Sequence, residues 1–481
     1  MRIVFFVFLF CNLGLTQSVP FFKTYGGADP ERGYSMTLTS DNGYILAGST
    51  SSFGQGTSDI FIVKTDLLGD TIWTKTYGTV PYDIGYAIEE TYDGGYIIAG
   101  QTGEPDTLSE LLSDVFVIKT NSVGEPNWAF SWNPGSGDRA YDVKQTTDSC
   151  YIVTGVLNAG LNTGTPSAFL AKLSKQGSLL WNKVFESHST AFSVTQSWDG
   201  GYLVSGYYGI PPQLQVYLVK TNANGEALWT KKGALGFQFG TGNSMVQTLD
   251  SNFVIAGSVY DDISSQVFLS KIAQTGDVIW TKKYGDDDDT CEGNAVIKSY
   301  DGGFIIAGST NNNSPGPFPT ADIWVIKTDK NGDTLWTRSY GTTTNEYGLD
   351  VQLSNTDGSI AIIGYTGLPA DMFLLKIDSL GNAPILASVN NLPSKSEPSM
   401  QVYPNPVEYV ATIELELPIK IANVRFTIFD YLGRAVQHFK KGYLQAGKNY
   451  TEINVTNLKS GTYFLKMSAN GYSQGTKFVK H

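Results

Sequence analysis

Histidine and cysteine are both scarce in this chain. Its 481 residues include three histidines, His188, His438 and His481, and three cysteines, Cys11, Cys150 and Cys291. So few histidines argue against histidine-rich metal sites and against a Ser-His-Asp triad. Cys150 and Cys291 fall in different repeats of the sequence, described below, so no disulfide framework is expected and each is predicted to be a lone buried thiol.

Long hydrophobic runs are also lacking. The apolar run from Ile3 to Leu15 follows Arg2 and holds 13 residues, and a transmembrane helix needs roughly 18. Gly14-Leu15-Thr16 at its end is typical of a signal peptidase site. We therefore expect residues 1–16 to be a signal peptide, whose removal also removes Cys11, and we expect the mature protein not to span a membrane.

Basic residues are outnumbered by acidic ones. The chain holds 33 Lys and Arg against 45 Asp and Glu, a net charge of −12, so nucleic acid and anionic lipid surfaces are poor partners. Glycine and aromatic residues are plentiful, with 52 Gly, 27 Tyr, 25 Phe and 9 Trp. This composition has ample material for a large β core.

Seven repeats fill the chain between Phe21 and Val389. An aspartate recurs every 51 to 56 residues, and a glycine follows each one at a fixed distance. The aspartates are Asp41, Asp93, Asp148, Asp199, Asp250, Asp301 and Asp357, and the glycines are Gly48, Gly100, Gly155, Gly206, Gly257, Gly308 and Gly364. Each repeat has four short runs with a period of two, which predicts four strands, the content of one propeller blade. We predict an all-β protein with a seven-bladed β-propeller over residues 17–389.

The two ends of the repeat array predict ring closure. Pro20–Gly26 copies the fourth run of later repeats, and the seventh repeat has a degraded fourth run without tryptophan. The N-terminal strand is therefore expected to complete the last blade, which would pair two otherwise exposed strand edges.

Two further series recur across the repeats and indicate architecture. One is tryptophan, expected between blades, where each ring buries roughly 150–250 Å²; the other is lysine, present in every repeat. The series are Trp73, Trp128, Trp181, Trp229, Trp280 and Trp336, and Lys64, Lys119, Lys172, Lys220, Lys271, Lys327 and Lys376. The turn Asp66-x-x-Gly69-x-x-x-Trp73 resembles the tryptophan-docking repeat of quinoprotein dehydrogenases and related outer-membrane assembly propellers. That resemblance implies a contact that ties blade to blade, and no recognisable set of quinone and calcium ligands accompanies it.

A ligand site is expected on the face of the propeller that carries the variable loops, near the mouth of the central channel. Two residues before each first strand, four of the seven repeats place an acid: Glu31, Asp83, Asp138 and Glu346. With Arg32 and Arg139 they are predicted to ring the mouth and to bind a cation, a cluster of sugar hydroxyls or a peptide amine. The alternative is that these carboxylates cap the crossover turns between blades.

An acidic loop on the same face is the candidate metal site. Asp286, Asp287, Asp288 and Asp289 are consecutive, and their carboxylates repel one another unless a cation such as Ca²⁺ joins them. The alternative is a solvent-exposed acidic loop. No other cofactor is expected.

The C-terminal segment has its own motifs. They are Tyr403-Pro404-Asn405-Pro406, Asp430–Arg434 with Gly433, Leu458–Phe464 with Gly461 and Tyr463, and the basic end Lys477–Lys480. Their order and spacing resemble the type A C-terminal sorting domain of the type IX, or Por, secretion system. The resemblance implies a small Ig-like β-sandwich at 401–481, after a Pro- and Ser-containing linker at 390–400. It also implies contact with the secretion machinery, export to the surface or exterior of a Gram-negative bacterium, and removal of the domain with release or surface attachment.

Together these features predict a secreted or cell-surface propeller that is expected to be monomeric. It is expected to bind polysaccharide or a protein partner, and the features favour a binding module over an enzyme. One alternative is a glycosidase or lyase that uses carboxylates at the channel mouth, since such chemistry needs acids but no histidine. A second alternative is a structural surface scaffold.

Overall fold

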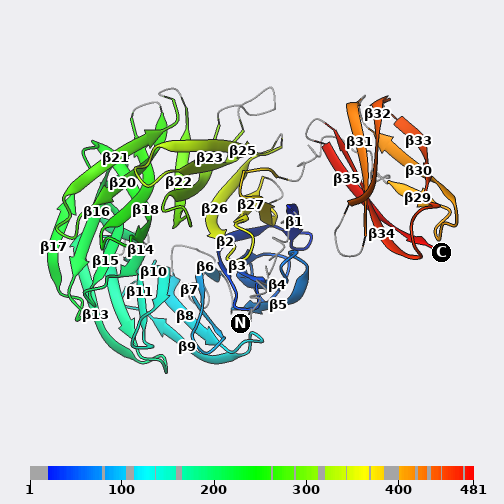
Figure 1. The fold of residues 1–481 in the computed structure, drawn as a ribbon. Coiled ribbons are helices and arrows are strands. Elements are labelled where there is room, and N and C mark those ends of the chain that lie inside the picture. The colour runs from blue at the N-terminus through cyan, green and yellow to red at the C-terminus, as the bar shows by residue number, and fades with distance from the viewer. Residues whose placement is uncertain are drawn as a thin grey trace, which may run out of the picture. The chain divides into compact units, whose positions relative to one another are not determined.

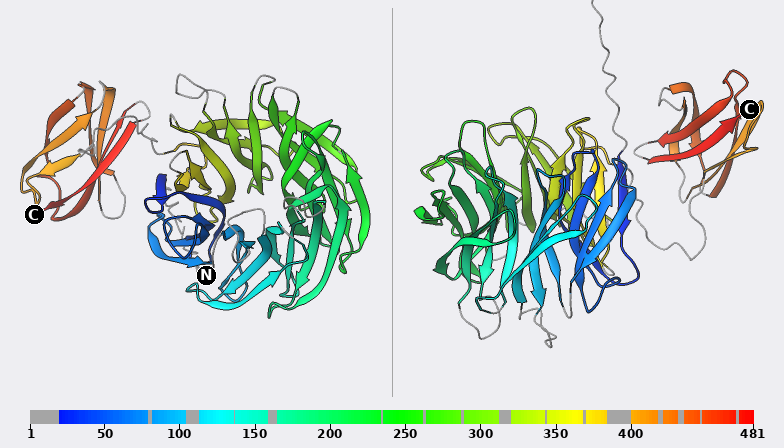
Figure 2. Two further views of the ribbon diagram at one scale, coloured as in Figure 1. Left: turned by 180° about the vertical axis from the view of Figure 1, so that it is seen from behind. Right: turned by 90° about the horizontal axis from the view of Figure 1, so that it is seen from below.

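The computed structural model describes residues 20–78, 82–103, 113–135, 137–158, 165–233, 235–261, 264–286, 289–311, 320–342, 344–367, 370–383, 400–417, 421–430, 435–445, 447–469 and 472–481. Every element of regular secondary structure in these ranges is a β-strand, which confirms the predicted all-β fold. The chain divides into two compact units between Ala383 and Pro384, and Figures 1 and 2 show each of them. The predicted signal peptide and all but the last residue of the predicted linker lie outside the described residues.

Within the described residues, the first unit contains seven four-stranded antiparallel sheets, called blades 1 to 7 below. Blade 1 is β2 (Glu31–Leu38), β3 (Tyr44–Thr50), β4 (Asp59–Thr65) and β5 (Thr71–Tyr77); blade 2 is β6 (Ile84–Glu90), β7 (Tyr96–Gly103), β8 (Ser113–Thr120) and β9 (Pro126–Trp132); blade 3 is β10 (Arg139–Gln145), β11 (Tyr151–Leu157), β12 (Ser167–Leu173) and β13 (Leu179–Ser187); blade 4 is β14 (Ser189–Gln196), β15 (Tyr202–Ile210), β16 (Gln213–Thr221) and β17 (Ala227–Lys232). Blade 5 is β18 (Phe239–Gln247), β19 (Phe253–Tyr260), β20 (Ser265–Ile272) and β21 (Val278–Tyr284); blade 6 is β22 (Cys291–Lys298), β23 (Phe304–Thr310), β24 (Asp322–Thr328) and β25 (Thr334–Tyr340); blade 7 is β26 (Glu346–Leu353), β27 (Ile360–Thr366), β28 (Met372–Ile377) and β1 (Phe21–Tyr25).

The blades form a closed β-propeller. The first strands β2, β6, β10, β14, β18, β22 and β26 contact one another in that order, and β26 contacts β2; they lie on the inner side of the unit in Figure 1. β1 pairs with β28, with Phe21 opposite Lys376 and Tyr25 opposite Met372. The expectation that the N-terminal strand completes the last blade is therefore confirmed.

A backbone irregularity explains the recurring glycine. Every first strand has a one-residue bulge, in which an extra residue disturbs the pairing with the second strand. A Cβ on the glycine opposite the bulge would lie only 1.7–1.9 Å from a carbonyl oxygen of the first strand, and this holds for Gly48, Gly100, Gly155, Gly206, Gly257, Gly308 and Gly364. Only glycine permits this approach of two backbones.

The repeated lysines and aspartates join in every blade. Each lysine lies near the end of the third strand with its side chain at most 16% exposed, and it reaches the aspartate of the turn between the first and second strands at N–O distances of 2.6–3.3 Å. The pairs are Lys64–Asp41, Lys119–Asp93, Lys172–Asp148, Lys220–Asp199, Lys271–Asp250, Lys327–Asp301 and Lys376–Asp357. These pairs define one side of the propeller, called the turn face below; the loops between second and third strands and the crossovers between blades lie on the opposite, loop face.

The tryptophans lie at the joints between blades. Each packs beside the turn glycine of the next blade, and the indoles of Trp128 and Trp229 donate hydrogen bonds of 3.0 Å to the carbonyl oxygens of Lys175 and Gln274. The joints are Trp73–Gly124, Trp128–Gly177, Trp181–Gly225, Trp229–Gly276, Trp280–Gly332 and Trp336–Gly381. At the closing joint, Phe21 of β1 packs beside Gly69, so phenylalanine takes the place of the seventh tryptophan.

The second unit is a small β-domain of two sheets. One sheet has the order β29 (Gln401–Tyr403), β30 (Val410–Leu417), β33 (Gly447–Asn454); the other has the order β32 (Ala435–Leu444), β31 (Ile421–Asp430), β34 (Gly461–Ala469), β35 (Tyr472–Lys480). Its own core includes Val407, Ile413, Phe426, Leu465 and Phe478, all fully buried or nearly so. Of the residues that the structure describes, none belongs to a helix long and apolar enough to cross a membrane.

Candidate functional site

The four acids predicted at the channel mouth are buried in the crossover turns. Glu31, Asp83 and Asp138 are 0% exposed and Glu346 is 1% exposed. Glu31 accepts hydrogen bonds from the backbone of Gly27 (3.0 Å) and from the Thr50 hydroxyl (2.7 Å). These contacts match the capping alternative, so a direct contact of these four carboxylates with a ligand remains a prediction.

Asp138 and Glu346 make the same kind of contact. Asp138 accepts hydrogen bonds from the backbone N–H groups of Gly135 (3.1 Å) and Asn158 (2.7 Å). Glu346 accepts three, from the Thr342 backbone (2.9 Å), the Thr342 hydroxyl (2.6 Å) and the Thr344 hydroxyl (2.7 Å). Each acid thus fixes a crossover as it enters the next blade.

The two arginines predicted beside these acids each contact a tyrosine side chain. The Arg32 side chain is exposed, and its guanidinium carbon lies 5.5 Å from the centre of the Tyr365 ring, a cation–π distance. Arg139 is half-buried and hydrogen-bonds Tyr141; burial raises the pKa of Tyr141 and the guanidinium opposes that rise. The structure therefore separates the predicted set into buried acids and arginines that contact tyrosine side chains.

Those rings belong to a series that the sequence interpretation did not single out. The bulged residue of the first strand is aromatic in blades 1 to 4: Tyr34, Tyr86, Tyr141 and Phe192. Successive ring centres are 5.2, 5.1 and 5.3 Å apart, and Tyr207 lies 5.6 Å beyond Phe192. Tyr347 and Tyr365 of blade 7, 5.1 Å apart, lie at the other end beside Tyr34.

We call these seven side chains, Tyr34, Tyr86, Tyr141, Phe192, Tyr207, Tyr347 and Tyr365, the aromatic belt. All are half-buried although they lie on first or second strands inside the propeller, so water reaches them. The remaining bulged residues are Asn243, Asn294 and Leu349. The amide groups of both asparagines donate to the backbone of the next first strand, to Gly293 and Gly348 at 2.9 Å, so the inner wall is aromatic on one side and mainly polar on the other.

A charged group lies on the first strands nearer the turn face. Lys144 lies 3.3 Å from Asp142 and 3.6 Å from Glu89, and its side chain is 45% exposed. Burial alone would lower the pKa of Lys144, but the two carboxylates outweigh it and raise that pKa. Burial also raises the pKa of Glu89, against the effect of Lys144.

The acidic loop borders a cavity of about 690 Å³ between blades 5 and 6. Asp286, Asp289, Lys283, Arg338 and Trp324 line it together with hydroxyl-bearing side chains. The backbone of Asp286 donates to Asp289 at 2.9 Å. Asp287 and Asp288 lie outside the described residues, and no group of three or more metal-binding His, Cys, Asp or Glu side chains occurs among the residues described. Calcium binding here stays a prediction.

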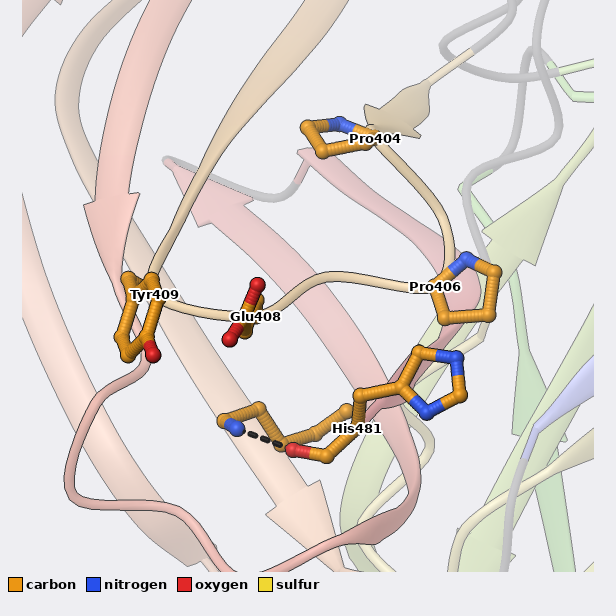
Figure 3. A pocket seen from close by; sticks show the side chains of 6 residues that line it. Pro404, Pro406, Glu408, Tyr409 and His481 are labelled. Atoms are coloured by element: carbon orange, nitrogen blue, oxygen red, sulfur yellow. Dashed lines mark hydrogen bonds between the residues drawn. The ribbon is translucent and has the colours of Figure 1, made fainter.

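In the second unit, the Tyr403–Pro406 motif packs against the C-terminal end of the chain. The Asn405 side chain accepts a hydrogen bond of 2.8 Å from the Val479 backbone. The Val407 N–H donates to the carbonyl oxygen of Val479 (2.8 Å), and the His481 N–H donates to the carbonyl oxygen of Val407 (2.9 Å). Pro404, Pro406, Glu408, Tyr409, Lys480 and His481 line a pocket of about 550 Å³ (Figure 3). Tyr463 stacks on Phe478, with ring centres 5.7 Å apart. Gly461 begins β34, and Gly433 is not among the described residues.

Comparison with known families identifies this second unit. Residues 401–481 match the family model described as the secretion system C-terminal sorting domain, Por_Secre_tail. The tail marks the chain for export by type IX secretion, so this is a secreted or outer-membrane surface protein of a Gram-negative bacterium, and it interacts with the secretion machinery during export. The curated proteins include no match to the chain.

Solved structures resemble the fold only distantly. A PL25 ulvan lyase is 9% identical, with 75% of this chain and 96% of that one covered and a TM-score of 0.49. Sqt1 of Chaetomium thermophilum, bound to the N-terminus of ribosomal protein L10, is 11% identical, with 74% and 98% covered and a TM-score of 0.40. PorZ, a surface component of the type IX system of Porphyromonas gingivalis, is 10% identical, with 93% and 81% covered and a TM-score of 0.23. At these scores the likenesses carry no argument about what this chain binds.

Proposed function

We propose that the exported chain is a seven-bladed propeller that binds an extracellular polysaccharide at the aromatic belt. The observation that carries the proposal is the belt itself, a row of half-buried rings presented on bulged first strands. The C–H-rich faces of sugar rings pack against aromatic faces, and ligand sites combine such rings with a few polar groups that fix orientation. Docking of each tryptophan on the next blade would keep this wall rigid.

The belt's cations favour a sugar that carries a carboxylate or sulfate group. Arg32 and Arg139 are attached to the first strands of blades 1 and 3, one at Tyr365 and one at Tyr141. A guanidinium offers a planar fork of donors to such an anion, and charge-assisted bonds of this kind are the stronger ones. A protein partner remains the alternative ligand, and a purely structural scaffold requires no ligand.

Titration calorimetry of the full chain with a panel of neutral, uronate-containing and sulfated polysaccharides tests the proposal. Tyr86→Ala with Tyr141→Ala should weaken binding at least tenfold, or about 1.4 kcal/mol. Tyr92→Ala is the matched control, because Tyr92 is 70% exposed in a turn-face hairpin, and it should leave affinity unchanged. Equal binding by the double variant, or no binding of any glycan by the parent chain, would refute the polysaccharide proposal.

A second candidate function is polysaccharide cleavage, which one residue favours. Glu292 lies on the first strand of blade 6, close enough to influence the pKa of Tyr365, and partial loss of water around its carboxylate raises its own pKa. A carboxyl group with a raised pKa suits general acid catalysis. Release of new reducing ends or unsaturated sugars, abolished by Glu292→Gln, would establish the enzyme; binding without product would establish the binding module.

The sorting tail gives the last part of the proposal. We propose that the tail is removed after export and that the propeller is released or attached to the cell surface. Mass spectrometry of the exported protein would detect a mature chain that ends before residue 401; an intact tail on the exterior protein would contradict this part alone.

A further inference from the structure

Carboxyl groups occur in pairs at the joints between blades. One member is the buried acid at or next to the start of a first strand. The other lies five residues before the repeated lysine, at or next to the start of the preceding blade's third strand. The pairs are Asp59 with Asp83, Asp114 with Asp138, Asp322 with Glu346, and Asp371 with Glu31. At the other three joints neither position is acidic: Ser167 with Ser189, Gln215 with Gly240, and Gln266 with Cys291. The two positions are acidic together or not at all, which indicates that they act as a unit.

The joint between blades 1 and 2 shows how closely the members meet. Asp59 is 2% exposed and Asp83 is 0% exposed. A Cβ on Gly78 would lie 2.4 Å from Asp59 Oδ1 and 2.6 Å from Asp83 Oδ2. Both oxygens therefore face the same small space, which only the absence of a side chain at Gly78 leaves open.

The joint between blades 6 and 7 shows how the two members differ. Glu346 accepts three hydrogen bonds from Thr342 and Thr344. Asp322 is 2% exposed, and its Oδ1 has no hydrogen-bond partner. Besides burial, the charge of Glu346 raises the pKa of Asp322, and the charge of Asp83 raises the pKa of Asp59. Burial and like charge therefore act together at both joints.

Two ionised carboxylates cannot remain together in such a buried place without a partner cation, because burial and like charge both disfavour the second charge. A proton held by one member removes that charge and turns it into a donor. We propose that the paired acids at the Asp59–Asp83 and Asp322–Glu346 joints each hold one proton in the folded protein, which makes the propeller more stable in mildly acidic than in mildly alkaline surroundings.

The expected titration supports this assignment. Burial and the neighbouring Asp83 raise the pKa of Asp59 to about 6, and burial and Glu346 raise the pKa of Asp322 to about 7. Asp371 is shifted in the same direction by burial and Glu31. Because an unfolded aspartate has a pKa near 4, the folded chain binds more protons than the unfolded chain between about pH 4 and 7, so stability falls as pH rises through that window.

The test is thermal unfolding of the full chain between pH 5 and pH 8, followed by tryptophan fluorescence. All 9 tryptophans lie between Trp73 and Trp336, so the signal reports the propeller and not the tail. The double variant Asp59→Asn with Asp322→Asn keeps the shape of both side chains. It gives each of them an amide donor that does not titrate. At pH 8 the double variant should melt at least about 2 °C above the parent chain, and the difference should vanish or reverse near pH 5.

Asp333→Asn is the matched control, since Asp333 is a surface aspartate whose side chain is 63% exposed beside Lys282, and it should not change the pH dependence. If the melting temperatures of the double variant and the parent differ by the same amount at every pH, the proposal is overturned. So would a rise in melting temperature on adding Ca²⁺ that the parent shows and the double variant loses, because the pairs would then hold a cation in place of a proton.

Discussion

The two faces of the propeller use carboxyl groups in opposite ways. On the turn face, seven aspartates each meet a buried or largely buried lysine, and the pKa of all seven aspartates is lowered, to about 2 for Asp148. Partial burial opposes this shift, and hydrogen bonds together with charge attraction outweigh it. At the blade joints of the loop face, acids meet other acids and the pKa is raised. Whether the pKa of a carboxyl group rises or falls is therefore set by the partner that the neighbouring strand supplies, and not by the type of residue.

The contrast predicts opposite responses to pH. A carboxyl group with a lowered pKa stabilises the fold above the pKa of the unfolded chain and loses that effect as pH falls through its folded value. The turn-face pairs therefore weaken below about pH 4, whereas the paired acids weaken the fold as pH rises toward 7. Maximum stability is therefore expected in mild acid, where these two pH ranges meet.

The largest effect is expected from a substitution that the paired backbones of the first and second strands cannot accommodate. Gly206→Ala would place a Cβ 1.9 Å from the carbonyl oxygen of Thr190, and backbone cannot move aside as a side chain can. We expect a loss of about 3 kcal/mol or more in the free energy of unfolding, measured by urea denaturation with tryptophan fluorescence. Gly242→Ala is the control, since its nearest neighbour would be a Val216 methyl group at 3.3 Å and two blades already carry alanine at this position. Equal losses in both variants would show that the bulge does not require glycine.

A smaller effect is expected from breaking one turn-face pair. Lys220 has 2% side-chain exposure and bonds Asp199 and the Thr221 carbonyl oxygen. Lys220→Met keeps the bulk of the stem but leaves that carbonyl without its donor, at an expected cost of about 2 kcal/mol. Urea denaturation at pH 7 and at pH 3 should show a smaller cost at the lower pH, where Asp199 begins to take up a proton. A cost independent of pH would mean that packing of the stem, and not the charge, stabilises the turn.

The smallest effect is expected from a pair outside the repeated series. Lys282 and Asp333 lie 2.7 Å apart, but their side chains are 39% and 63% exposed. Lys282→Met should cost less than about 1 kcal/mol, because water and salt screen exposed pairs. Denaturation at low and high salt concentrations measures this cost. A cost equal to that of Lys220→Met would show that buried and exposed pairs do not differ in this protein.

Much of the fold was accessible from the sequence, because its signals are local. The period-two runs and the repeated aspartate, glycine and lysine predict four-stranded units, and β1 closes blade 7 as the copied motif at Pro20–Gly26 indicated. The sorting motifs were equally legible, and Asn405 holds the last strand through its side chain.

The candidate site was less accessible, for two physical reasons. A bulge adds one residue to a strand, so regular alternation does not reveal that Tyr34, Tyr86, Tyr141 and Phe192 form one wall; aromatic residues after the small residue in four successive repeats were the signal available. The paired acids are separated by 24 residues and a blade boundary in the case of Asp59 and Asp83. Their contact depends on how two blades meet, which a single repeat cannot show.

The strand that closes blade 7 has a consequence for the order of folding. Phe21 pairs with Lys376, so the ring cannot be completed until nearly the whole propeller has been synthesised. Until then β1 lacks its partner strand β28, and pairing across so long a stretch of chain is slow. The sorting tail follows this last blade in the sequence, so a chain that has gained its export signal has also gained every residue that closure of the ring requires.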